Sequence, residues 1–573
     1  MKSKKTRNLI LISVFFMLFA VNLGYNITLQ SYFKADEKVN SFVNLKTSAS
    51  HTSTVIINDT SPTDNWIMAE ASGLCNGSGT PSDPYIIFDD IFSVSSGSTL
   101  LILNSRKNFE IVSCVFLSTT FAPGIIMSNI TNGVFEDNEI ESIAGGGLLV
   151  DNCSQITFIS NLFDDSSASF GIELDNCKDL TFQSNTISNS DSAGVFLDDS
   201  NDITFTDNII FNNTYGIYNE NSNNTVIEGN TIGPNSIDGI FVEESYHGQI
   251  LNNDINGNLG NGIELDESNS FLISLNTVNN NQYGIYLHSS SQFNTISENT
   301  VNSNNNDGII LFYVDYNVID QNTINHNGGE GFYNTGCDHS IVSGNTAYNN
   351  TGHGLRFYYA ENITVLNNEA YENTEAGLRF YNVDDSTIEN NLAHHNGWDG
   401  IRLRTGCERN SLKGNTATFN NYSGIYLFDY CDENAVYQNT ASNNEEHGIY
   451  IENSINVVIT INTANTNKLN GIHLQDSNGN SIIYNTANGN ANGTFLLSSD
   501  NNVVVGNTFL NNVVCYNETG SSNNLFSDNI CTAPSVPPPG LDPFVLGMII
   551  GLAIGLGALA LVVIFSLVRG RKR

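Results

Sequence analysis

Short apolar strands recur along the chain with a fixed period. Each strand opens at a glycine and then alternates apolar with polar residues, as in residues 262–266, which is the period of a β-strand and not of a helix. Successive glycines are 22, 23 or 24 residues apart. Such a period predicts a solenoid, in which each repeat buries its apolar face only by stacking on its neighbours. The opening glycines are Gly124, Gly147, Gly171, Gly194, Gly216, Gly239, Gly262, Gly284, Gly308, Gly331, Gly354, Gly377, Gly400, Gly424, Gly448, Gly471 and Gly493.

An asparagine follows every one of these glycines by 14 or 15 positions. Asparagine tolerates the left-handed bend of a tight corner, and stacked Asn side chains can hydrogen-bond along a ladder, so we expect this row to be structural. The row consists of Asn138, Asn161, Asn185, Asn208, Asn230, Asn253, Asn276, Asn299, Asn322, Asn345, Asn368, Asn391, Asn415, Asn439, Asn462, Asn485 and Asn507.

Each repeat contains three short strands. The first is the segment that opens at the glycine, the second resembles residues 203–205, and the third begins at the asparagine, as in residues 322–324. No leucine-rich helical half is present, which excludes a horseshoe repeat. The pattern therefore predicts an all-β parallel β-helix solenoid of about 19 coils of 22–24 residues, and at ~4.8 Å per coil the rod is roughly 90 Å long.

The terminal segments predict a membrane protein. A basic start and an apolar run from Leu9 to Leu23 resemble a secretory signal, and no cleavage site is obvious after them, so residues 1–25 are predicted as a signal peptide or signal anchor. Residues 544–568 carry no charge and are long enough to cross ~30 Å of hydrocarbon as a transmembrane helix. The basic tail 569–573 favours the cytoplasmic side, which places the repeats outside the cell.

Four further segments are expected between these ends. They are a linker (26–64), an N-terminal cap or entry segment (65–96), the β-helix itself (97–531) and a stiff Pro-rich stalk (532–543). A cap is expected because an open stack of coils would expose unpaired strand edges. The sequence therefore predicts a single-pass protein of the cell membrane whose β-helix is extracellular.

Charge narrows the class of partner. The chain has 59 acidic and 21 basic residues, eight of the basic ones lie at the two termini, and the segment between them therefore has a net charge near −46. Such a rod repels phosphate backbones and attracts divalent cations, which excludes nucleic acid as the expected partner. The nine cysteines cannot all pair internally, and twelve Asn-x-Ser/Thr sequons are candidate glycosylation sites of a glycoprotein.

The repeat array resembles a known family. Trp66, Cys75 and the run 77–87 are similar to the entry segment that precedes the parallel β-helix repeats of pectate-lyase-like proteins, in particular the NosD-type carbohydrate-binding β-helices. The resemblance covers roughly residues 65–531 and implies a right-handed parallel β-helix. Members of this family include lyases, hydrolases, epimerases and binding proteins, so the resemblance implies polysaccharide as the ligand class but leaves activity open.

Basic residues inside the array are concentrated in a few coils. Only eight lie between Gly124 and Asn529, and six of them fall between positions 356 and 413. Three of these arginines take the same outward position on consecutive coils, and planar guanidinium groups pair well with carboxylates, which predicts a site for an anionic glycan. We expect Tyr333 and Tyr426 to bracket this site with their ring faces. The predicted binding residues are Arg356, Arg379, Arg402, Arg404, Tyr333, Tyr358, Tyr381 and Tyr426.

A different interpretation of the same arginines is also open. Nearby acids such as Glu375, Asp384 and Asp399 could neutralise them internally, in which case no external anion is needed. Exposed aromatic residues in the same rows could likewise serve only to stack between coils.

A second outward row is acidic. Five carboxylates fall on successive coils, and like charges at ~4.8 Å repel, so we expect bound cations, raised pKa values or splayed side chains. Oxygen-rich stacks suit Ca²⁺, which makes this row a candidate metal site, although the acids could also serve only to keep the rod soluble. The predicted metal-binding residues are Asp175, Asp198, Glu220, Glu243 and Asp266.

These features predict a membrane-anchored extracellular module that binds polysaccharide or surface glycan. The first alternative is a surface-anchored polysaccharide lyase, hydrolase or epimerase, and the second is a passive structural protein of the cell envelope. Asp399 with Arg402 is only a fragment of the catalytic pattern that the resemblance implies for pectin hydrolases. No catalytic residue is therefore assigned, and we favour binding without turnover.

Overall fold

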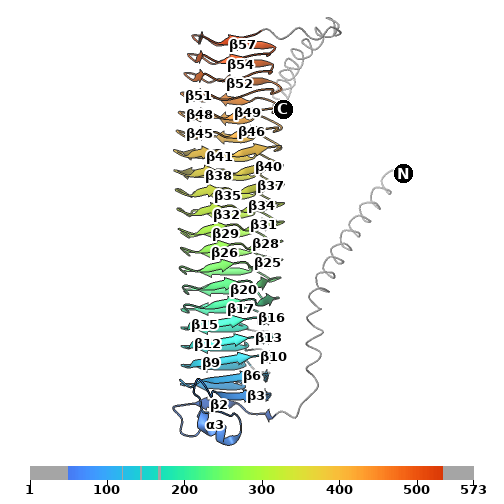
Figure 1. Ribbon diagram of the computed structural model, residues 1–573, viewed down its shortest axis with the longest axis vertical. Helices are drawn as coiled ribbons and strands as arrows, with labels where there is room; N and C mark the ends of the chain where they lie inside the picture. Colours follow the sequence, from blue (N-terminus) through green and yellow to red (C-terminus); the bar gives the residue numbers. More distant parts are fainter. Residues whose placement is uncertain (1–48, 119–120, 142–144, 165–168, 533–573) are drawn as a thin grey trace, which may run out of the picture.

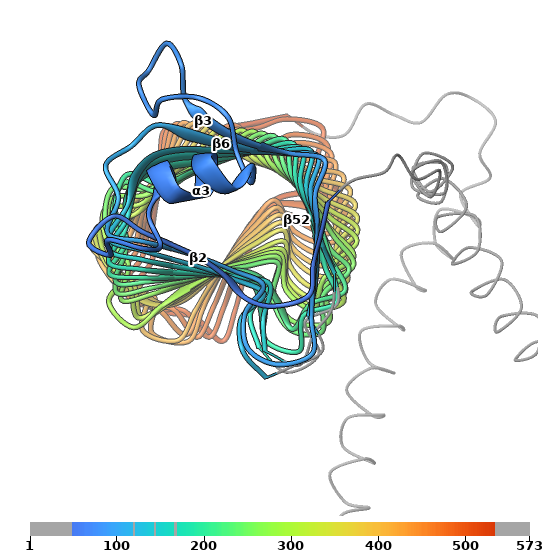
Figure 2. The same cartoon turned by 90° about the horizontal axis from the view of Figure 1, so that it is seen from below.

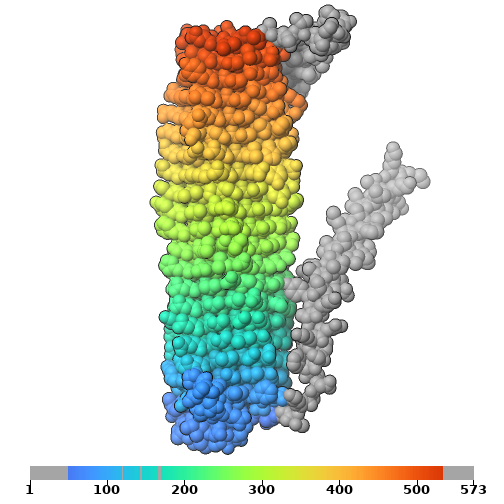
Figure 3. All heavy atoms as spheres, in the orientation of Figure 1, coloured from blue at the N-terminus to red at the C-terminus, as the bar shows by residue number. Residues whose placement is uncertain are grey.

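The computed structural model describes residues 49–118, 121–141, 145–164 and 169–532, which form one rod of stacked coils (Figure 1). The coils contribute strands to three parallel sheets, with isolated bridges at Thr463 and Thr486 in place of strands of the third sheet, and Figure 3 shows the coils as successive layers of one continuous rod. The predicted all-β parallel β-helix of about 19 coils is confirmed.

The strands of the first sheet open each coil, and those of the second and third sheets follow in order. The first sheet contains β2 (Val55–Asn58), β5 (Leu100–Leu103), β8 (Ile125–Ser128), β11 (Leu148–Asp151), β14 (Ile172–Asp175), β17 (Ala193–Asp198), β20 (Tyr215–Glu220), β23 (Ile240–Glu243), β26 (Ile263–Asp266), β29 (Ile285–His288), β32 (Ile309–Phe312), β35 (Phe332–Thr335), β38 (Leu355–Glu361), β41 (Leu378–Asp384), β44 (Ile401–Arg404), β47 (Ile425–Phe428), β50 (Ile449–Glu452), β52 (Asn470–Gln475), β54 (Asn492–Leu497) and β57 (Val514–Thr519).

The second sheet contains β3 (Tyr85–Phe88), β6 (Phe109–Val112), β9 (Thr131–Glu136), β12 (Ser154–Ile159), β15 (Lys178–Gln183), β18 (Thr204–Thr206), β21 (Val226–Glu228), β24 (Gln249–Leu251), β27 (Leu272–Ser274), β30 (Thr295–Ser297), β33 (Val318–Asp320), β36 (Ile341–Ser343), β39 (Thr364–Leu366), β42 (Thr387–Glu389), β45 (Ser411–Lys413), β48 (Ala435–Tyr437), β51 (Val458–Thr460), β53 (Ser481–Ile483), β55 (Val503–Val505) and β58 (Leu525–Ser527).

The third sheet contains β1 (Ser50–His51), β4 (Ile91–Val94), β7 (Val115–Ser118), β10 (Glu139–Glu141), β13 (Leu162–Asp164), β16 (Thr186–Ser188), β19 (Ile209–Phe211), β22 (Thr231–Ile232), β25 (Asp254–Asn256), β28 (Thr277–Asn279), β31 (Thr300–Asn302), β34 (Thr323–Asn325), β37 (Thr346–Tyr348), β40 (Glu369–Tyr371), β43 (Leu392–His394), β46 (Thr416–Thr418) and β49 (Thr440–Ser442). The short strands β56 (Thr508–Phe509) and β59 (Ile530–Cys531) pair at its C-terminal end.

The alternation in the sequence decides which side chains form the core. In β26, Ile263 and Leu265 are fully buried, whereas Glu264 and Asp266 point outward. Each residue pairs with its equivalent on the next coil, so that Ile263 lies opposite Ile285. Equivalent side chains therefore stack into columns along the rod, both inside it and on its surface.

The predicted asparagine row is a buried hydrogen-bonded ladder. The backbone N–H of Asn322 donates to Asn345 Oδ1 at 2.9 Å, and Asn322 Nδ2 donates to the carbonyl oxygen of Ile296 at 2.8 Å. The left-handed bend lies one residue earlier than predicted, because Gln321 has φ of 54° while Asn322 does not have a positive φ. The asparagine contributes its amide to the ladder, and its neighbour makes the corner.

The N-terminal end of the rod is covered by the helix α3 (Trp66–Ser72), which lies across the end of the coils (Figure 2). Trp66 is fully buried and stacks on Tyr85 at 5.1 Å between ring centroids. The cap that was expected in residues 65–96 is therefore present, but part of it belongs to the first coil. Because β2 pairs with β5, the coils begin inside the predicted linker 26–64 and before residue 97. Because a long segment that contains α3 separates β2 from β3, the first coil does not show the repeat of 22–24 residues in the sequence.

The C-terminal end is closed by different means. Glu518 lies in register with the buried Leu496 of the preceding coil, so a charge takes an apolar position, and such a charge opposes further strand addition. A disulfide joins Cys515 to Cys531. The other seven cysteines are buried free thiols.

Several predicted segments lie outside the described residues. These are the signal segment 1–25, most of the linker and of the stalk, the transmembrane helix 544–568 and the tail 569–573. Within the ranges given above, no helix is both long enough and apolar enough to cross a membrane.

Candidate functional site

The predicted arginines lie side by side on the outer face of the first sheet. Tyr333, Arg356, Arg379, Arg402 and Tyr426 are in register on five consecutive strands, β35, β38, β41, β44 and β47. We call Arg356, Arg379 and Arg402 the arginine row. The structure thus brings the predicted residues together, since the neighbouring outward row, two positions further along the strands, contains Tyr358, Tyr381 and Arg404.

The tyrosine rings pack against the guanidinium groups. The guanidinium carbon of Arg356 lies 4.9 Å from the centre of the Tyr333 ring, and that of Arg402 lies 5.1 Å from the centre of the Tyr426 ring. The other face of Tyr426 stacks on Tyr450 at 4.6 Å. Both faces of Tyr426 and the Arg356 side of Tyr333 are thus covered by the rod itself, and the expectation that the ring faces bracket a sugar stays a prediction for the other face of Tyr333. What remains for a ligand is the edge of the stack, where N–H and hydroxyl groups lie.

Two arginines of the row have carboxylate partners within the rod. Arg356 Nη1 donates to Glu330 Oε1 at 2.7 Å. Arg402 Nη1 lies 3.4 Å from Oδ2 of Asp399, a carboxyl group that is only 2% exposed and whose pKa burial raises to about 6. The interpretation that internal acids neutralise the arginines is therefore correct for Arg356 and Arg402.

Arg379 has a different neighbour. Its Nη1 lies 2.8 Å from Nε2 of His353, a fully buried histidine whose Nδ1 accepts the backbone N–H of Ala376 at 2.9 Å. Because Nδ1 accepts a hydrogen bond, the proton of the imidazole must be on Nε2, which donates to Glu375 Oε2 at 2.7 Å. Nε2 is then a donor and offers Arg379 no acceptor.

No carboxylate forms an ion pair with Arg379 in the part of the chain that the structure describes. Its Nε–H is buried without a hydrogen-bond partner there, as are those of Arg356, Arg402 and Arg404. Burial lowers the pKa of the Arg379 guanidinium, the charges of Arg356 and Arg402 lower it further, and the Glu375 carboxylate opposes part of this shift. A half-buried cation without a direct ion pair is costly, so an external anion at this position would add to the stabilisation that Glu375 supplies.

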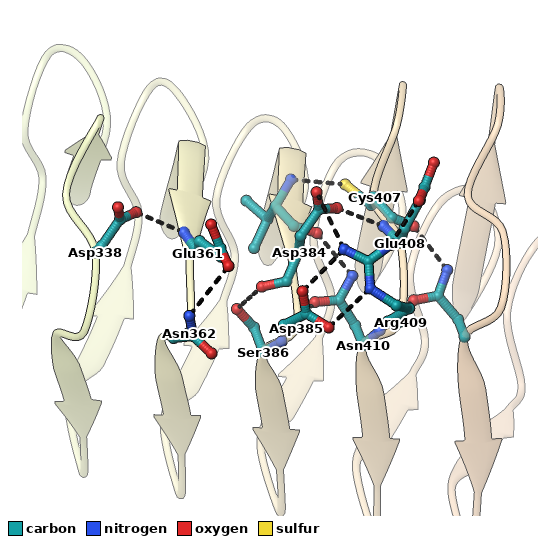
Figure 4. A network of polar contacts seen from close by, with 12 residues as sticks. Asp338, Glu361, Asn362, Asp384, Asp385, Ser386, Cys407, Glu408, Arg409 and Asn410 are labelled. Atoms are coloured by element: carbon teal, nitrogen blue, oxygen red, sulfur yellow. Dashed lines mark hydrogen bonds and ion pairs between the residues drawn. The ribbon is translucent and has the colours of Figure 1, made fainter.

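The remaining predicted counter-ion, Asp384, serves another arginine. Figure 4 shows Arg409 on the turn after the first sheet, where it binds Asp385 at 2.8 Å and Glu408 at 2.7 Å and lies 3.8 Å from Asp384. Asp384 therefore does not neutralise the arginine row. Arg404 packs its guanidinium over the Phe428 ring at 5.5 Å and, within the described ranges, also lacks a carboxylate partner.

The residues that decide these pairings form a row that sequence analysis missed. They stand directly before the opening glycines, and we call them the pre-glycine row. Their signal was present in the sequence, since each lies 26 or 27 residues before the outward position of the next coil. The members around the arginines are Asp307, Glu330, His353, Ala376 and Asp399.

The predicted acidic row is also in register, on β14, β17, β20, β23 and β26. Burial raises the pKa of Asp198 and Glu220, and the neighbouring carboxylates raise both further. Glu243 accepts a hydrogen bond from the Tyr218 hydroxyl, and Asp266 lies 3.4 Å from His288. Raised pKa values, one of the three expected outcomes, are thus present.

No metal centre is preformed on this row. Across the described ranges, no three His, Cys, Asp or Glu side chains are placed as a metal ion would require. The prediction of Ca²⁺ at Asp175, Asp198, Glu220, Glu243 and Asp266 stays a prediction.

Comparison with known proteins identifies the repeat. The family model described as the right handed beta helix region matches residues 165–301, 289–441, 377–509 and 413–535. These overlapping matches run from residue 165 to residue 535, which is more than half of the 573-residue chain. No curated protein matches the chain.

Several solved structures are similar to it at low identity. The A-module of the mannuronan C-5 epimerase AlgE6 from Azotobacter vinelandii is 13% identical, covering 77% of this chain and 91% of that chain with a TM-score of 0.28. A mutant of the periplasmic alginate epimerase AlgG is 17% identical, with 55% and 74% covered and a TM-score of 0.31. The Dettilon tailspike protein gp208 is 14% identical, with 60% and 62% covered and a TM-score of 0.34. At such scores their functions are not carried over to this chain.

Proposed function

We propose, starting from the chain's membership of the right-handed β-helix family, that this protein is an extracellular binding module for acidic polysaccharides. Arg379 on the outer face of the first sheet is the group that takes the anion, with Arg404 as its neighbour on the next coil. The observation that carries the proposal is the guanidinium of Arg379, which is half-buried between two other arginines, lies against a histidine N–H and forms no direct ion pair, while the charge of Glu375 acts on it from beyond that histidine.

The chemistry of the site favours a charged ligand over a neutral one. Neutral sugars bind aromatic side chains through ring faces, but Tyr333 and Tyr426 turn their faces to arginines. The groups left at the surface of the stack are guanidinium N–H donors, which match carboxylate or sulfate groups in charge and geometry. A polysaccharide that carries such groups is therefore the best-matched ligand.

Binding without turnover is supported by the burial of two of the titratable groups beside the arginines, His353 and Asp399, whereas the Glu375 carboxylate is 32% exposed. His353 is fully buried and Asp399 is 2% exposed, so neither side chain can reach a bound sugar as an acid or a base. A lyase, hydrolase or epimerase remains the alternative, and release of shortened or epimerised product would favour it. A purely structural protein of the envelope would bind no acidic glycan.

The same proposal includes the position of the protein in the cell. The predicted transmembrane segment 544–568 and the basic tail 569–573 would anchor the rod to the membrane by its C-terminal end. The arginine row would then lie part of the way along the rod, outside the cell.

The proposal is tested by titrating the full-length chain and two arginine variants with oligogalacturonate and with a neutral oligosaccharide. Arg379→Gln should weaken binding of the acidic ligand about tenfold, because it removes a charge-assisted contact. Arg409→Gln is the matched control, since it also removes one positive charge but from a turn where three carboxylates already surround it. Equal affinity of the parent for both ligands, or equal losses in both variants, would contradict the proposal.

A further inference from the structure

Two neighbouring coils show the same contact geometry with different chemistry. Glu330 accepts the backbone N–H of His353 with Oε2 and an N–H of Arg356 with Oε1. His353 accepts the backbone N–H of Ala376 with Nδ1 and faces Arg379 with Nε2. Both side chains belong to the pre-glycine row, and each meets the backbone 23 residues later and the arginine 26 residues later.

The difference between the two coils is the charge that the arginine meets. Glu330 gives Arg356 a carboxylate, whereas His353 gives Arg379 a neutral imidazole whose proton is fixed on Nε2. The backbone N–H of Ala376 fixes that tautomer, and Glu375 accepts the Nε2 proton. His353 thus satisfies the backbone as a glutamate would, and leaves the guanidinium without a carboxylate in direct contact, since Glu375 lies beyond the imidazole.

We infer that His353 is the positioning residue that keeps Arg379 available to an external anion, and that Glu330 masks Arg356 from the same ligand. The inference rests on the proposed function and specifies it. The acidic polysaccharide binds mainly at one guanidinium of the arginine row and not at three. For Arg356 and Arg379, the pre-glycine residue of the preceding coil sets whether the arginine can bind it.

The third coil pairs its arginine in another way. Ala376 holds the pre-glycine position that lies 26 residues before Arg402, and alanine has no group to offer it. Arg402 instead pairs with Asp399 of its own coil, at the longer distance of 3.4 Å. Arg379 is therefore the member of the arginine row to which the pre-glycine residues supply no carboxylate.

The test exchanges the charge at position 353 while keeping the backbone contact. His353→Glu would present to Arg379 the carboxylate that Glu330 presents to Arg356, and should weaken oligogalacturonate binding by the full-length chain about tenfold. His353→Gln keeps an oxygen for the Ala376 N–H but adds no charge, so it should restore most of the parent's affinity. A merely structural role for His353 would make the two variants bind alike, and that result would overturn the inference.

A second variant works in the opposite direction and does not depend on how well position 353 tolerates change. Glu330→Gln removes the carboxylate from Arg356 and should strengthen oligogalacturonate binding about tenfold. Glu389→Gln, which removes the partner of Lys413 on the second sheet, is the control for the same change in net charge and should leave the affinity within about twofold of the parent.

The failures are distinguishable. If the parent does not bind oligogalacturonate at all, the proposed function is wrong. If the parent binds and Glu330→Gln does not bind more tightly than Glu389→Gln, the masking of Arg356 is wrong while the proposed function stands.

Discussion

Two regions on the outer face of the first sheet stack like charges at the same spacing but relieve the repulsion differently. In the region from Asp175 to Asp266, burial and neighbouring charge raise the pKa of Asp198 and Glu220, so these groups take up protons more readily than free carboxyl groups. In the region from Arg356 to Arg402, the guanidinium groups cannot lose their protons at accessible pH. They are instead covered by tyrosine rings and by Glu330 and Asp399.

The two regions differ in the means by which a stack of like charges can be neutralised. A stack of carboxylates can neutralise itself by taking up protons from water, so its backbone geometry alone does not require a ligand. A stack of arginines needs a partner for each member, and the pre-glycine row supplies carboxylates to two of the three. Each prediction below alters one side of this comparison.

The largest effect is expected in the acidic region, at the buried carboxyl of Asp238. This side chain is 4% exposed, and burial together with Glu264 raises its pKa to about 7. Because the pKa of Asp238 is higher in the folded state than in the unfolded state, the ionised carboxylate destabilises the fold. This free-energy cost is complete above about pH 7 and disappears as the pH falls towards 4. Asp238→Asn should therefore raise the free energy of unfolding at pH 8 by about 3–4 kcal/mol. Urea unfolding of the parent and the variant at pH 8 and at pH 4 measures this difference in the free energy of unfolding. An equal gain at both pH values would contradict the raised pKa of Asp238.

The histidines beyond the arginine row should give the opposite dependence on pH. Burial lowers the pKa of His447 to about 4, so its neutral form is required in the folded rod. Because the unfolded chain takes up the proton of His447 first as the pH falls, the free energy of unfolding decreases below pH 6.5. The decrease amounts to about 3 kcal/mol at pH 4. His447→Gln should remove most of this loss, since an amide oxygen can still accept the Asn470 N–H. A variant that loses as much stability as the parent between pH 7 and pH 4 would refute this explanation.

Calcium should stabilise the rod through the acidic region and not through the arginine region, and this effect should be smaller than the two pH-dependent ones. If Ca²⁺ binds the row from Asp175 to Asp266, a concentration ten times Kd stabilises the rod by about 1.4 kcal/mol, which appears as a rise in Tm of a few degrees. Glu220→Gln should reduce the rise, whereas Glu330→Gln in the arginine region should not. An unchanged Tm between chelator and millimolar Ca²⁺ would reduce the acidic row to a solvated surface.

The smallest effect concerns the rings that cover the arginines. Tyr333 lies over the Arg356 guanidinium at 4.9 Å, and such contacts contribute about 0.5–1 kcal/mol at partly exposed sites. A double-mutant cycle with Tyr333→Leu and Arg356→Met isolates this coupling from the loss of packing. A coupling energy near zero would mean that the ring serves only to fill space.

The stacking of equivalent residues into columns was predictable from the sequence. The ion pairs that their side chains form were not. A repeat of 22–24 residues places equivalent positions in register, so Arg356, Arg379 and Arg402 had to lie side by side once the coils were recognised. Which acid meets which arginine depends on side-chain reach between neighbouring coils. Glu330 was not among the proposed counter-ions, and Asp384 was proposed although it lies beside Arg409.

The ends of the rod were less predictable than its middle for a related reason. The first coil contains a long excursion that carries α3, and an excursion of that length breaks the period on which the prediction rested. At the other end, the disulfide between Cys515 and Cys531 depends on where the last turn brings two residues 16 positions apart. The spacing of cysteines along the chain does not determine that distance.

The central claim is that the rod recognises a polysaccharide by its charge, and a pair of ligands that differ only in charge tests it most directly. The full-length chain would be titrated with oligogalacturonate and with the same oligosaccharide after reduction of its carboxyl groups to alcohols, at low and at high salt. We expect binding of the acidic form alone, with an affinity that falls as salt rises because the contact is ionic. Equal binding of both forms, or an affinity for the acidic form that does not change with salt, would contradict the claim.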